Sequence, residues 1–334
     1  MNTQSQVTKI ELPKLIPTFK LGFDTVANRI SLILLPVILD LFLWFGPHFS
    51  LNQLLQPFIK QITTFPGLDT PDMSQTASSI QTLWQTIAEK SNLGIAIRTF
   101  PVGVPSLLFG QSPLQTPLGN AHIIEIPSYT LVIGWWLVFI IGGLILGSIF
   151  FNQLSREIFR EKTAENFHHL TWVILQVFLL TFAFIVLIIV FSIPAMILVP
   201  VLALINPGVA QFLLPFFALV LIWLLVPLFF SPHGIFAYHQ NAIISMLTST
   251  RMVRASLPGS GLFLLAVLVF GQGLDVLWSI PPATSWLALV GIAGHAFIST
   301  SLLAASFVYY RDIMHWAQST IQQKQANTPP APNI

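Results

Sequence analysis

Two carboxylates and one imidazole stand in parts of the sequence that are otherwise rich in Leu, Ile, Val and Phe. Asp40, Asp275 and His295 each interrupt an apolar stretch that could cross a membrane. Placing a charged side chain at the centre of a bilayer costs at least ~2.5–3.5 kcal/mol, so residues of this kind face protein or water and are functional candidates. The chemistry open to such a set is proton transfer, or coordination of a cation or polar substrate.

The two carboxylates are expected at similar depth. Asp40 lies seven residues before Pro47, and Asp275 lies six residues before Pro281. At about 1.5 Å per helical residue, each carboxylate is about 10 Å from the outer end of its helix. The predicted intramembrane polar cluster therefore comprises Asp40, Gln272, Asp275 and His295. The alternative is that each side chain bonds within the bundle or reaches water near the outer face.

Composition identifies the elements that must hold these residues. Charged residues make up 8% of the chain and hydrophobic residues 54%, and the stretch 166–250 contains no Asp, Glu, Lys or Arg. An ordinary soluble domain carries about 25% charged residues, so the chain is expected to be an all-α, polytopic membrane protein. The formal net charge of +2 is too small to indicate nucleic-acid binding.

Hydropathy predicts six transmembrane helices accompanied by amphipathic interfacial helices. An interfacial segment (1–29) precedes the first transmembrane segment (30–47), and an extracytoplasmic region (48–127) follows it. The other five spans lie within 128–310. A disordered tail (311–334) ends the chain. The predicted spans are 30–46, 130–151, 170–191, 209–230, 262–280 and 286–309.

Several residues are expected to shape these segments. Pro194 and Pro200 should kink or end the third span, and Pro57 should interrupt the first outer helix. A second outer helix is expected to start at Thr70-Pro71-Asp72. Gly143 and Gly147 form a GxxxG pattern that would let another helix approach closely. Trp44 and Trp278 are expected in the interfacial aromatic belt.

The basic residues predict the orientation. With the N-terminus in the cytoplasm, 11 of the 14 Lys and Arg residues fall in cytoplasmic segments, and the other 3 lie in the long outer region. Positive residues favour the cytoplasmic side, so we expect a cell-membrane protein with both termini inside.

Catalytic and metal-binding motifs are not found in the sequence. The chain has no cysteine, no HExxH, no GxSxG and no P-loop, so we predict no catalytic residue, metal or cofactor, and an enzyme is disfavoured. Four histidines are expected to contact lipid headgroups, namely His168, His169, His233 and His239. His48 and His122 lack a cysteine or a close acidic companion, so no zinc site is predicted there.

One element carries a resemblance. Ser245-Met-Leu-Thr-Ser249-Thr-Arg251-Met-Val-Arg254 resembles the A-L-x-x-S-x-x-L-V-R element of a loose group of six-helix bacterial membrane proteins of unknown function. The same group includes the membrane domain of some glycerophosphodiester phosphodiesterases. Met246 replaces the usual Ala, and the phosphodiesterase catalytic domain is absent. Over about 153–310, the resemblance implies a six-helix bundle and no reaction.

Three classes of function remain, of which an intramembrane lipid enzyme is the least favoured, because no clustered acid/base or metal set is found at one interface. The first is a non-enzymatic membrane scaffold or partner subunit that binds lipid and, through 48–127, another membrane or extracytoplasmic protein. The alternative is a transporter or channel subunit that uses Asp40, Asp275 and His295 to handle protons or substrate.

Overall fold

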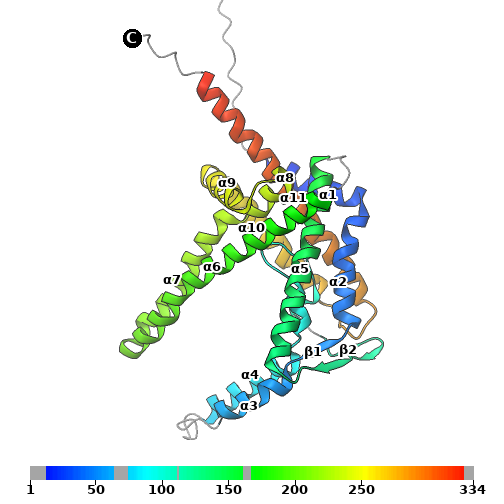
Figure 1. The fold of residues 1–334 in the computed structure, drawn as a ribbon, viewed down its shortest axis with the longest axis vertical. Coiled ribbons are helices and arrows are strands. Elements are labelled where there is room, and N and C mark those ends of the chain that lie inside the picture. Colours follow the sequence, from blue (N-terminus) through cyan, green and yellow to red (C-terminus); the bar gives the residue numbers. More distant parts are fainter. Residues whose placement is uncertain (1–12, 64–73, 111–112, 161–166, 327–334) are drawn as a thin grey trace, which may run out of the picture. The chain divides into compact units, whose positions relative to one another are not determined.

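The computed structural model describes residues 13–63, 74–110, 113–160 and 167–326. It is 81% helical, which confirms the all-α prediction (Figure 1). Five helices in the described ranges are long and apolar enough to cross a membrane. The pair Leu15–Asn28 and Ile30–Phe45 passes the same test only together, bent by 92°, as a broken span or a re-entrant loop. The five are Tyr129–Phe159, His169–Ile205, Gly208–Tyr238, Leu257–Trp278 and Ala288–Thr320. The chain is therefore a multi-pass helical membrane protein.

The chain divides into two compact units. Unit 1 comprises 1–29, 152–270 and 301–334, and unit 2 comprises 30–151 and 271–300. Helices α5 (Tyr129–Phe159), α10 (Leu257–Trp278) and α11 (Ala288–Ala326) contribute residues to both units.

Unit 1 is built from helices on either side of an aromatic core. Its other elements are α1 (Leu15–Asn28), α6 (Phe167–Ile205), α7 (Pro207–Leu225), α8 (Ser231–Tyr238) and α9 (Ala242–Ala255). Helices α6 and α7 lie side by side as a long hairpin (Figure 1). Asn206 caps the start of α7, where its side chain accepts hydrogen bonds from the N–H groups of Gly208 and Val209.

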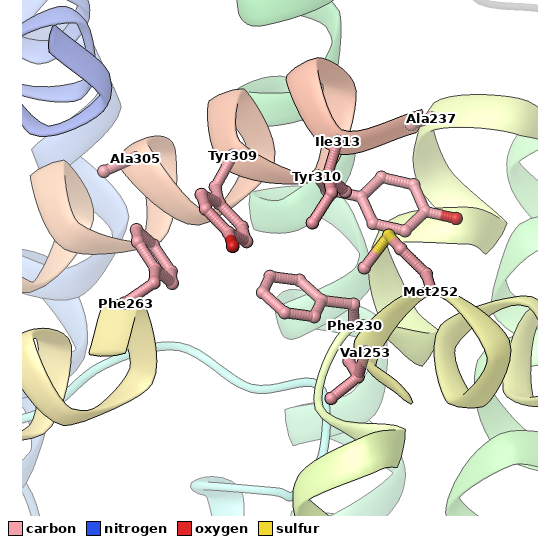
Figure 2. Close-up of a cluster of buried hydrophobic side chains, with 9 residues drawn as sticks. All are labelled: Phe230, Ala237, Met252, Val253, Phe263, Ala305, Tyr309, Tyr310 and Ile313. Carbon is pink, nitrogen blue, oxygen red and sulfur yellow. The ribbon is translucent and has the colours of Figure 1, made fainter. Parts of the chain in front are cut away.

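Stacked rings hold the core of unit 1 together. Figure 2 shows Phe230, which follows α7, among side chains from α9, α10 and α11. Phe263 and Tyr309 stack with their ring centroids 4.4 Å apart, and Phe230 lies 5.7 Å from Tyr309. Phe19 brings α1 onto the same cluster by stacking on Phe263 at 5.3 Å. Offset stacking of buried rings adds to the stability gained from removing their area from water.

The prediction of a disordered tail from residue 311 is wrong for its first part, because α11 continues to Ala326. Ile313 is fully buried in the core of unit 1, and Trp316 packs against that core. These contacts, together with the good helix formers Ala and Gln that follow, favour the continuation of the helix to Ala326. Residues 327–334 lie outside the described part of the chain.

The prolines of the third span do not end it. Helix α6 runs for 39 residues through Pro194 and Pro200. Each proline removes one N–H donor, but helix is the only conformation that satisfies the remaining backbone groups of an apolar segment in lipid. Pro57 likewise lies inside a helix, α3, without interrupting it.

Unit 2 combines spans with the outer region. Its other helices are α2 (Leu34–Phe45), α3 (Asn52–Thr63) and α4 (Ser74–Lys90). Strand β1 (His48–Ser50) pairs in parallel with β4 (Ile123–Glu125), and β2 (Gln115–Thr116) pairs with β3 (Gly119–Asn120) as a small hairpin. Helices α3 and α4 lie side by side (Figure 1). The expected helix start at 70–72 falls outside the described residues.

The GxxxG surface of α5 packs against the end of a short 3-10 helix, Leu93–Ile97, and against the loop that follows it. A Cβ atom on Gly143 would lie 2.0 Å from the carbonyl oxygen of Ile97, and one on Gly147 would lie 2.8 Å from the Cα of Gly103. The segment 98–110, which we call the inserted loop, therefore begins against these glycines. Gly147 is 18 residues into α5, about 27 Å along the helix. The close neighbours of Gly143 and Gly147 are thus the end of this short helix and the loop, and the packing of a further helix here stays a prediction.

This contact yields a prediction. Gly143→Ala should destabilise the protein by about 1–3 kcal/mol, since the added methyl group has no room beside Ile97. Gly142→Ala is the matched control, because a Cβ there meets no atom within 4 Å. The control should be neutral or stabilising, as Ala is a better helix former than Gly. Thermal unfolding in detergent measures both, and equal midpoints for the two variants would contradict the close approach of the loop.

Candidate functional site

Asp40 is the anchor of the inserted loop. Its side chain is fully buried on α2. The hydroxyl of Ser106 donates to Oδ1 at 2.5 Å, and the N–H groups of Leu107 and Leu108 donate to Oδ2 at 3.0 Å and to Oδ1 at 3.2 Å. A carboxylate that accepts three hydrogen bonds satisfies donors that lipid could not. These hydrogen bonds agree with the alternative interpretation of Asp40, in which its side chain bonds within the protein.

Asp275 and His295 form a second polar element. Asp275 lies one turn before the end of α10, and His295 lies two turns into α11. The Nδ1 atom of His295 is 2.6 Å from Oδ1 of Asp275. The carboxylate remains 38% exposed while the imidazole is 6% exposed. A carboxylate in this position fixes the orientation of the imidazole ring.

The other nitrogen of His295 is available for chemistry. Its Nε2 atom is buried and has no hydrogen-bond partner among the described residues. A buried polar atom without a partner carries a free-energy cost, and such atoms in native proteins call for an explanation. The site thus offers one imidazole nitrogen held by a carboxylate and one that can accept or release a proton.

Arg98 adds a positive charge that sequence reasoning missed. It opens the inserted loop, and its guanidinium carbon lies 4.4 Å from the centroid of the Phe109 ring. Desolvation of the guanidinium lowers the pKa of Arg98, while the charges of Asp275 and Asp40 act in the opposite direction. Both carboxylates are therefore close enough to influence the same cation. The sequence did contain a signal for this role, because Arg98 is a basic residue at the start of a proline-rich, apolar segment.

Gln272 does not join the cluster. It is exposed on α10, one turn before Asp275. The part of the predicted cluster that the structure brings together is Asp275 with His295, and Arg98 links this pair electrostatically to Asp40.

The two tryptophans pack inside unit 2 and do not form an exposed belt. Trp44 is 1% exposed, and its Nε1–H donates to the carbonyl of Ala283 at 2.9 Å. Trp278 packs so closely on Gly294 that a Cβ there would lie 2.6 Å from the ring. Both tryptophans lie at helix ends, Trp44 in the last turn of α2 and Trp278 at the end of α10, so the expectation of an interfacial depth stays a prediction.

His233 also departs from expectation. It is buried in unit 1, and its Nε2 atom is 2.7 Å from the hydroxyl oxygen of Ser306. Its ring centroid lies 4.3 Å from that of Phe307. Helix α8 is enclosed by its neighbours, so His233 cannot contact headgroups.

The role of Asp40 predicts a local loss of structure. Asp40→Ala would leave the buried N–H of Leu108 and the half-buried N–H of Leu107 without an acceptor, and a buried donor that loses its partner costs about 1–3 kcal/mol. The variant should unfold at lower temperature, and a cysteine placed at 107 should become more reactive. Asp24→Ala, at an exposed position of α1, is the control and should change stability by less than about 0.5 kcal/mol. Unchanged reactivity at 107 would argue against an anchored loop.

Comparison with known proteins adds no relative to this description. No family model matches the chain, and neither does a curated protein or a solved structure. The resemblance of 245–254 to the element of six-helix bacterial membrane proteins therefore stays a prediction.

Proposed function

We propose that this multi-pass membrane protein handles protons, or a small polar solute moved together with protons, through the Asp275–His295 pair. The observation that carries the proposal is the 2.6 Å contact between the two side chains, combined with a buried Nε2 atom that has no partner in the described chain. Ionisable groups on transmembrane helices that pair with one another commonly mark proton relays.

Each charged residue has a distinct role in the proposal. His295 takes up a proton at Nε2, and Asp275 balances the charge of the resulting imidazolium through Nδ1–H. With Asp40, Asp275 and Arg98 charged, the site has a formal charge of −1, so protonation of His295 brings it to zero. Arg98 also offers a contact for an anionic or polar solute. Asp40 acts indirectly, since it holds the loop that carries Arg98.

The inserted loop supports a transport role in a second way. Irregular backbone at membrane depth is tolerated where it is buried in protein or lines a water-filled cavity. Here the loop reaches the middle of α5 and brings Arg98 toward two carboxylates. We further propose that both termini are cytoplasmic, as the basic residues indicate. In that orientation Asp275 lies nearer the outer face than His295 does, and protons would enter from that side.

Proton flux tests the roles of the pair. Purified protein in liposomes under a pH gradient should carry protons, and His295→Gln should reduce the flux by at least tenfold because no titrating nitrogen remains. Asp275→Asn should also reduce it, since the charge that balances the imidazolium is lost. His122→Gln, at an exposed position of the outer region, is the control. Equal flux from wild type and His295→Gln would refute the role of His295.

Cysteine accessibility provides an independent test, because the chain has no native cysteine. A cysteine at 275 should react with a membrane-impermeant thiol reagent, and one at 295 should react more slowly. A cysteine at 40 should be protected by the inserted loop. Protection at both 275 and 295 in folded protein would mean that water does not reach the pair.

A second candidate function rests on the α3–α4 hairpin of the outer region. Phe58, Leu83 and Ile87 are 48%, 58% and 43% exposed there, although the hairpin has its own internal contact between Phe58 and Trp84. Apolar side chains exposed together on an extramembrane element favour a partner-binding surface. This observation supports a scaffold or partner subunit that acts through 48–127.

The scaffold candidate predicts a change in complex size. Leu83→Glu combined with Ile87→Glu should dissociate a partner bound to the hairpin, because two charges would be buried at the interface. Gln81→Glu, an exposed polar position on α4, is the matched control. Native gel electrophoresis of solubilised membranes should show a smaller complex for the double variant only. An identical size for all three proteins would remove this candidate.

A further inference from the structure

Two histidines far apart in the sequence meet in unit 1. His169 lies in the first turn of α6, and His239 lies between α8 and α9. The Nε2 atom of His169 is 2.7 Å from Nδ1 of His239. Their rings are nearly perpendicular, at 87°, with centroids 4.3 Å apart. Such an arrangement aims one ring nitrogen of each residue at the other.

The elements that carry the pair are tied together nearby. The buried side chain of Gln176, two turns after His169 on α6, accepts a hydrogen bond of 2.9 Å from the N–H of Ala242. Ala242 begins α9, three residues after His239. The N–H of Gln240 also bonds to the carbonyl of Gly234. The approach of the two imidazoles is therefore fixed by the packing of α6 against the α8–α9 joint.

The backbone of His239 gives an independent indication. It adopts φ 52° and ψ 31°, the left-handed conformation, at the C-cap of α8. Glycine is the usual residue at such a helix end because it has no Cβ to clash. A side chain retained in this conformation is typical of positions where function requires it, including ligand clamps. At this position the side chain retained is an imidazole directed at a second imidazole.

The chemistry of the contact admits two states. In the first, one nitrogen carries a hydrogen and donates it to the other. In the second, both lone pairs point to a shared cation. Imidazole nitrogen is a preferred ligand of Zn²⁺ and of neighbouring transition-metal ions. With Zn–N distances of about 2.0 Å and tetrahedral geometry, two ligand nitrogens are about 3.3 Å apart, so the pair would open only slightly.

We propose that His169 and His239 form a binding site for a borderline divalent metal ion, for which Zn²⁺ is the natural probe. Each residue contributes one ring nitrogen, and water or other donors complete the coordination. Established zinc sites have three or four protein ligands. A site with only two histidines is therefore expected to bind the ion with lower affinity. Bound metal would fasten the α8–α9 joint to the start of α6. Sequence reasoning missed the site because the two residues are 70 positions apart.

Metal-dependent stability of the full chain tests the proposal. The protein is purified without a histidine tag, stripped with a chelator, and unfolded by heat at increasing Zn²⁺ concentrations, with Mg²⁺ as the reference ion. Binding to the folded state raises the midpoint as the ion concentration increases. We expect Zn²⁺ to raise the midpoint and Mg²⁺ to leave it unchanged. His169→Ala and His239→Gly should each weaken the Zn²⁺ response at least tenfold in concentration.

Two variants separate a ligand role from a structural one. His239→Gly removes the imidazole and suits the left-handed backbone, so without metal it should unfold at the wild-type temperature or above. His315→Ala, at an exposed position of α11 in the same unit, should keep the full response. The proposal is overturned if Zn²⁺ does not stabilise the wild type, or if His239→Gly responds as the wild type does. A pair that lowers stability when mutated but gives no Zn²⁺ response is a hydrogen-bonded histidine pair only.

Discussion

The hydrogen bonds accepted by Asp40 are the constraint on which unit 2 depends. A loop of irregular backbone beside a transmembrane helix exposes N–H groups that lipid cannot satisfy. Asp40 accepts hydrogen bonds from Ser106, Leu107 and Leu108, and the glycines of α5 let the start of the loop approach. Once the loop is held, Arg98 has a defined position relative to both carboxylates. Removal of the Asp40 carboxylate therefore affects the site even though this carboxylate takes no part in the proposed chemistry.

Asp40 and Asp275 have different surroundings and therefore different roles. Asp40 is enclosed and all its described partners are donors, so it serves architecture. Asp275 is partly exposed and faces an imidazole whose other nitrogen has no described partner. Both precede a tryptophan by a few residues, and both tryptophans are packed within unit 2. The two aspartates differ in their partners, which are hydrogen-bond donors of the inserted loop for Asp40 and the imidazole of His295 for Asp275.

Sequence reasoning predicted the class of fold and a polar cluster that included Asp275 and His295, but not which of its members would pair. Apolar runs of about 20 residues identify spans because lipid admits few alternatives to a helix. Depth along the helices matched Asp40 with Asp275, whereas the structure pairs Asp275 with His295. The neighbours of Gly143 could not be predicted, since a glycine allows any segment of the chain to approach closely. Arg98, Ser106 and the His169–His239 pair depend on contacts between distant segments, for which periodicity contains no signal.

The length of the α6–α7 hairpin has a consequence for the surrounding bilayer. Helix α6 contains an uncharged, strongly apolar segment of 37 residues from His169 to Ile205, which is about 55 Å of helix against a hydrocarbon thickness of about 30 Å. Its far end has no charged residue that would mark a boundary, and Leu204 is 89% exposed there. Such a hairpin must tilt steeply, bend at its prolines or thicken the membrane around it. Membrane thickness, and with it lipid composition, would then determine the angle at which this arm stands and the strain on the rest of unit 1.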